Sequence, residues 1–93
     1  MTTLQIKIPD SLEKKYDGSG FALAAISIDG LSLIDFRYCR DIDDSFDEDV
    51  SPLAAAAQIV ANGRFKAFGE FFEIEDHSRV AFGMISCREF IEL

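Results

Sequence analysis

A long uncharged segment followed by a turn signal constrains this chain more than any other feature of its sequence. Residues 21–28 (FALAAISI) carry no charge, Asp29-Gly30 follows them, and residues 31–38 (LSLIDFRY) are again rich in apolar and aromatic side chains. Asp-Gly between two apolar runs is among the strongest short-range signals for a β-hairpin. We therefore expect two antiparallel strands here, joined by a tight turn.

Further segments also have strand patterns. Residues 4–8 alternate apolar and polar side chains, which is typical of a half-buried strand, and Pro9 ends the run. Residues 70–75 and 80–87 are rich in aromatic and β-branched residues and flank the polar tetrapeptide DHSR. They predict a second hairpin, and residues 88–93 are expected to continue its last strand beyond a kink.

One helix is predicted between the two hairpins. Residues 51–52 (SP) combine an N-cap serine with a first-turn proline, and residues 62–63 (NG) end the segment. The apolar positions at helical spacing, which we expect to pack on the sheet, are Leu53, Ala56, Ala57 and Val60.

Strands, a helix and further strands in one short chain indicate an α+β fold. We expect an antiparallel β-sheet of about five strands with one or two short helices packed on it. The chain is interpreted as a single domain, 1–93, because no shift in composition marks a second core. Residues 11–15 can close one helical turn, and residues 64–69 fit either a helical turn or the start of a strand.

The charge balance excludes several classes of partner. Nine Lys and Arg against seventeen Asp and Glu give a net charge of −8. Such a surface repels phosphate and anionic lipid, so we expect no direct nucleic acid binding, no membrane binding, and a basic protein as the favoured partner. The N-terminal residues lack the pattern of a secretory signal, which predicts a cytoplasmic location in which Cys39 and Cys87 stay reduced.

The residues of an enzyme or a metal site are not evident in the sequence. Cys87 and His77 are the minimum for a cysteine nucleophile, but they lie on one expected hairpin with no Asn or Gln nearby to orient the imidazole. The acidic run at residues 41–49 begins like a calcium-binding loop, yet Phe46 and Pro52 stand where that motif needs Gly and Glu. We expect no catalytic residue, no metal and no cofactor.

Three sequence blocks, taken together, resemble one known family. They are residues 16–27 (YDGSGFALAAIS), 40–42 (RDI) and 83–93 (GMISCREFIEL). Their order and spacing are similar to those of the broad-spectrum anti-CRISPR family that inhibits type II-C CRISPR effector nucleases. The blocks lie near both ends of the domain, whereas residues 43–79 show little similarity.

The resemblance implies both a function and a site. Members of this family are small acidic proteins of phages and mobile elements, and they bind the HNH domain of the nuclease, blocking cleavage while target DNA can still bind. By matching positions, Ser86 and Cys87 would reach the HNH active site and Asp17 would contact the domain. Possible supporting contacts are Tyr16, Asp41 and Arg88. The chain would then be a monomer that binds one HNH domain, and not an enzyme.

Some positions depart from the family pattern. Ser19 and Phe21 stand in a stretch where the family has cysteines, and Arg88 stands where a tryptophan is expected. Aromatic residues are common interface hot spots, so the change at Arg88 bears on binding strength and target range. The alternative hypothesis is an acidic protein–protein interaction module, a DNA mimic, that acts on another basic partner.

Overall fold

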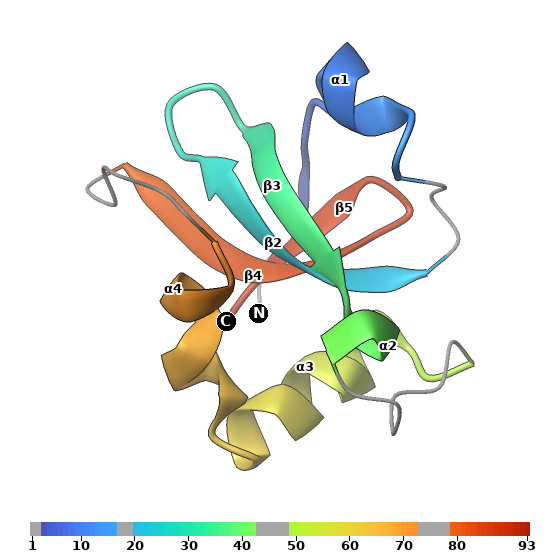
Figure 1. Ribbon diagram of the computed structural model, residues 1–93, viewed down its shortest axis with the longest axis vertical. Coiled ribbons are helices and arrows are strands. Elements are labelled where there is room, and N and C mark those ends of the chain that lie inside the picture. The colour runs from blue at the N-terminus through green and yellow to red at the C-terminus, as the bar shows by residue number, and fades with distance from the viewer. Residues whose placement is uncertain (1–2, 17–19, 43–48, 73–78) are drawn as a thin grey trace.

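The computed structural model describes residues 3–16, 20–42, 49–72 and 79–93 as a five-stranded antiparallel sheet with short helices packed on it, which confirms the expected α+β fold (Figure 1). The strand order is β1-β5-β4-β2-β3. The strands are β1 (Thr3–Gln5), β2 (Phe21–Ser27), β3 (Ser32–Tyr38), β4 (Val80–Ser86) and β5 (Glu89–Glu92). The helices are α1 (Asp10–Glu13), α2 (Cys39–Ile42), α3 (Pro52–Ala61) and α4 (Phe68–Phe71), with a 3₁₀ turn, η1, at Arg64–Ala67.

The sheet curls until its two outer strands are connected through one residue. β1 and β3 lie at opposite ends of the strand order, yet Lys7, just beyond β1, forms a bridge to the start of β3. The Lys7 amide donates to the Leu31 carbonyl and the Lys7 carbonyl accepts from the Leu33 amide, both at 2.8 Å. The sheet is therefore closed at this point, as in a small barrel.

β2 is buried on both faces, which explains its uncharged sequence. Its even-numbered residues between 22 and 26 face an enclosed core that also holds Phe36 and Phe90. Its odd-numbered residues between 21 and 25 face a second core that includes Ile59 of α3 and Phe72. In Figure 1, α2, α3 and α4 gather on one side of the molecule, and α1 lies at the other.

A β-bulge in β3 explains why the spacing of its apolar residues changes along the strand. Two neighbouring residues of β2 pair with Leu33 and Asp35, so Ile34 between them has no partner residue. The extra residue brings Leu33 and Phe36 to the same core despite their odd spacing. Ile34 remains 38% exposed.

α3 begins and ends where the sequence predicts. The Ser51 hydroxyl accepts a hydrogen bond from the Ala54 amide at 3.2 Å, as an N-cap does. The chain leaves the helix through Gly63, whose φ of +73° lies in the left-handed region that glycine tolerates.

The predicted packing face of α3 is wrong for three of its four residues. Ala56 is buried as expected, but Ala57 is exposed and both Leu53 and Val60 are 54% exposed. The buried residues of the helix are Ala55, Ala56 and Ile59. Because most positions of this helix are apolar, helical spacing alone does not distinguish between overlapping stripes, and the fit against β4 and β5 selects one.

The second predicted hairpin is also wrong in its first strand. Phe68–Phe71 forms α4, and Phe72 is buried with its ring stacked at 6.1 Å from that of Phe82. Residues 73–78 lie outside the described residues. β4 pairs instead with β2 and with β5, so residues 89–92 form a separate strand that runs back along β4, and not a continuation of it.

β4 and β5 approach closely at Gly83. A Cβ atom at this position would lie 2.1 Å from the Ile91 carbonyl oxygen and 2.7 Å from Cζ of Phe90. Only glycine leaves room for this approach, so Gly83 is needed where β5 lies against β4.

We expect Gly63→Ala to destabilise the protein by about 1 kcal/mol, because a Cβ atom is disfavoured in the left-handed region. Gly30→Ala is the matched control: an added Cβ meets no atom within 4 Å at either glycine, and only Gly63 has a positive φ. Gly30→Ala should leave the free energy of unfolding unchanged or slightly higher, since alanine restricts the unfolded chain. Urea unfolding of both variants checks this, and equal losses would contradict it.

Candidate binding surface at the β4–β5 turn

Ser86 and Cys87 lie where β4 turns back into β5. Ser86 pairs with Glu89, so Cys87 and Arg88 are the two residues of the turn. Their φ values are 51° and 65°, which is the conformation of a type I′ turn. Such turns usually contain Asn or Gly, and other residues in this region cost about 1–2 kcal/mol each. Contacts elsewhere must therefore stabilise this turn.

Three contacts with distant segments hold the turn through Arg88. Its guanidinium forms an ion pair with the Glu13 carboxylate of α1. Its amide lies 3.4 Å from the Tyr16 hydroxyl, to which it donates, and its carbonyl accepts from the Ile6 amide, also at 3.4 Å. These contacts point Arg88 back toward the body of the protein, so Arg88 positions the turn.

Tyr16 holds the turn from the core side, through the hydrogen bond that its hydroxyl accepts from Arg88. Its side chain is 4% exposed, and its ring packs edge-on against Phe36 at 5.5 Å and stacks on Tyr38 at 6.3 Å. Burial raises the pKa of the Tyr16 phenol above its ordinary value, and the hydroxyl accepts the bond from the Arg88 amide. Tyr16 acts on this surface through the backbone of the turn, since its ring belongs to the core.

A small polar pair is thereby presented at the surface. Cys87 is exposed, Ser86 is half-buried, and the Ser86 hydroxyl donates to Cys87 Sγ over 3.8 Å. Neither cysteine forms a disulfide. The other thiol, that of Cys39, is buried, and burial raises its pKa to about 12. The surface at the turn thus offers one thiol and one hydroxyl.

The other predicted residues are not all brought to this turn. Asp17 follows Tyr16 directly but lies outside the described residues, as do His77 and residues 43–48 of the acidic run. Asp41 is exposed on α2 and lines a hollow of about 200 Å³ that does not include the Ser86–Cys87 pair.

Sequence reasoning missed Glu13. The residue lies 75 positions before Arg88 and carries no motif, so its role depends on the way the sheet curls.

Neither the side chains of the described residues nor comparisons with known proteins assign a function to this chain. Within residues 3–16, 20–42, 49–72 and 79–93, no three His, Cys, Asp or Glu side chains gather in a way that would hold a metal ion. No helix in the same residues has the length and apolar character needed to cross a bilayer. No protein-family model matches the chain, and a search of curated proteins finds no match.

We expect Cys87→Gly to stabilise the protein by about 0.5–1 kcal/mol, because glycine adopts the φ of this turn without a Cβ clash. Ser86→Gly is the neighbouring control and should destabilise, since a glycine weakens a strand. Thermal unfolding of the two variants measures both signs. Destabilisation by Cys87→Gly comparable to that by Ser86→Gly would show that the turn is not strained.

Proposed function

We propose that this chain inhibits a type II-C CRISPR effector nuclease by placing the β4–β5 turn in the active site of the HNH domain. The observation that supports this most is the turn itself, which presents Ser86 and Cys87 on a backbone that Glu13 and Tyr16 hold in place. An exposed turn with a small thiol suits a cleft that normally receives a phosphate. A pre-organised turn also loses little conformational entropy on binding.

The charge of the chain supports the same partner. A net charge of −8 is complementary to a protein surface that binds DNA. The one cation in the turn, Arg88, is paired with Glu13, so its charge is compensated locally. Glu89, which follows the turn, is exposed and accepts a hydrogen bond from Gln5 at 3.3 Å. The charges next to the Ser86–Cys87 pair therefore do not repel a basic cleft.

Under this proposal the protein is a stoichiometric inhibitor and not an enzyme. It uses no cofactor, acts in the bacterial cytoplasm and binds one HNH domain per copy. A DNA-cleavage assay of a type II-C nuclease, paired with a DNA-binding assay, tests the proposal. We expect cleavage to be lost at a one-to-one ratio while target DNA stays bound. Full cleavage in the presence of excess protein would overturn the proposal, and loss of DNA binding would favour DNA mimicry.

We expect Ser86→Ala with Cys87→Ala to weaken inhibition about thirtyfold or more, because groups at the centre of a small interface are commonly worth about 2 kcal/mol. Since Cys87 is exposed, the melting temperature should change little. The matched control is Leu31→Ala with Ser32→Ala, where the β2–β3 connection enters β3. Leu31 is an exposed residue of positive φ, and Ser32 is a half-buried strand serine.

The control variant should inhibit as the wild type does. A folded Ser86→Ala/Cys87→Ala variant that inhibits fully would falsify the assignment of this pair to the HNH contact. Equal loss of inhibition in both variants would show that the assay reports general disturbance of the hairpins.

The acidic interaction module remains a second candidate function because residues 41–49 hold six acidic side chains. To separate the two, we would neutralise the run by changing to Asn or Gln the residues Asp43, Asp44, Asp47, Glu48 and Asp49. If the run only steers binding, association should slow and lose its salt dependence while dissociation stays the same. Stopped-flow rates at several salt concentrations measure this. Complete loss of binding would instead favour the DNA mimic.

A further inference from the structure

The outer edge of β3 is a second surface of interest, separate from the β4–β5 turn. β3 is the last strand in the sheet order, and a last strand normally presents unpaired N–H and C=O groups to which another chain can bond. Lys7 occupies the beginning of this edge through its bonds to Leu31 and Leu33. The rest of the edge lies beyond the bulge at Ile34, with Phe36 at its centre.

Phe36 directs its backbone groups away from β2. Along an antiparallel pair of strands, hydrogen-bonded and non-hydrogen-bonded positions alternate. The Leu33 amide bonds outward to Lys7, so the pair of Leu33 with Ile26 is non-hydrogen-bonded. Two residues further along β2, Ala24 takes the equivalent position opposite Phe36. The N–H and C=O of Phe36 therefore point to the edge at which a sixth strand would bond.

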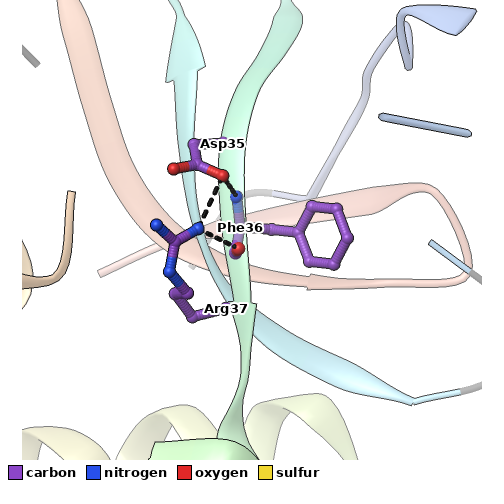
Figure 2. A network of polar contacts seen from close by, with 3 residues as sticks. All are labelled: Asp35, Phe36 and Arg37. Atoms are coloured by element: carbon purple, nitrogen blue, oxygen red, sulfur yellow. Dashed lines mark hydrogen bonds and ion pairs between the residues drawn. The ribbon is translucent and has the colours of Figure 1, made fainter. Parts of the chain in front are cut away.

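Two side chains of the same strand form hydrogen bonds with both of these backbone groups (Figure 2). The Asp35 carboxylate accepts from the Phe36 amide, and the Arg37 guanidinium donates to the Phe36 carbonyl, each at 2.8 Å. The same two side chains form an ion pair at 2.7 Å. Figure 2 shows them meeting on one side of the strand while the Phe36 ring points to the other.

Arg37 is also held from the helical side of the sheet. The carbon at the centre of its guanidinium lies 5.7 Å from the centre of the Phe72 ring, within the range of a cation–π contact. Asp35 and Arg37 are only partly exposed, with 30% and 46% of their side-chain surfaces accessible. The two side chains therefore lie against the protein as an ordered cap. We call this pair the edge clasp.

We propose that the edge clasp keeps the chain monomeric by preventing β3 from pairing with β3 of a second copy. The sequence of the strand fits such a pairing. An antiparallel alignment centred on Phe36 places Asp35 of one copy opposite Arg37 of the other, and the reverse, which is a favourable cross-strand arrangement. The groups that close the edge within one copy are thus complementary between two copies. The clasp competes with the dimer for the backbone of Phe36.

Asp35→Ala with Arg37→Ala tests the proposal, because it removes both caps and leaves the net charge unchanged. It also removes the cross-strand Asp35–Arg37 pairs, so association of this variant depends on the freed backbone groups of Phe36. Light scattering should show the mass of this variant rising with concentration toward twice the 10.4 kDa of one chain. Under the same conditions the wild type should keep the mass of a single chain. The matched control is Asp29→Ala with Arg79→Ala, which removes another exposed ion pair with the same charges. Asp29 lies in the turn before β3, so this control should remain monomeric.

Two further variants separate the edge clasp from a general loss of stability. Asp35→Asn with Arg37→Lys keeps an acceptor for the Phe36 amide and a donor for its carbonyl, so it should stay monomeric. Ile34→Lys added to the alanine pair places a charge on the reopened edge and should restore the monomer. The proposal is overturned if the alanine pair stays monomeric, if Ile34→Lys does not reverse its association, or if the Asp29→Ala/Arg79→Ala control associates.

Amide hydrogen exchange in the wild type gives a test that needs no stable variant. The Phe36 amide should exchange slowly although its acceptor is a side chain on the outer edge. Exchange at the rate of an exposed loop amide would show that the edge is open in solution, and it would overturn the proposal.

Discussion

Burial of β2 on both faces is the constraint on which the rest of this structure depends. A central strand without charged side chains needs apolar cover on each side. α3 and Phe72 supply the cover on one face, and the curl of the sheet, closed at Lys7, supplies it on the other. That curl also brings the segment of Glu13 and Tyr16 under the β4–β5 turn. The enclosed core and the candidate surface are therefore products of the same geometry.

The β4–β5 turn shows how long-range contacts maintain a backbone that is locally unfavourable. Cys87 and Arg88 adopt positive φ without the help of glycine or asparagine. Unusual backbone of this kind persists where the surroundings determine it, and it is found most often at functional sites. Here the surroundings are α1, Tyr16 and the segment after β1. A turn held in this way can present a thiol in one orientation, which is what the proposed inhibition requires.

The edges of the sheet are managed by separate means. Lys7 covers the beginning of β3 with backbone bonds, and the edge clasp covers Phe36 with side-chain bonds. Natural sheets commonly protect their edges with charges and bulges, and β3 has both. The two proposals are independent, because the turn connects β4 and β5 while the clasp lies on the outer edge of β3. In a monomer, the β4–β5 turn is the hairpin that exposes a free thiol among the described residues.

Local signals in the sequence determined the α+β class, the β2–β3 hairpin and both ends of α3. Ser-Pro and Asn-Gly act through bonds within a few residues, and Asp-Gly marks the chain reversal, although the residue of positive φ there is Leu31 and not Gly30. Sequence resemblance also singled out Ser86 and Cys87. Only the tertiary structure decided that the chain reverses at Cys87, that the Phe-rich segment 68–71 is helical and which face of α3 is buried. The turn carries no glycine, and the apolar patterns fit several packings. Contacts with residues far away in the chain, such as Glu13 and Tyr16 at the turn, make the choice.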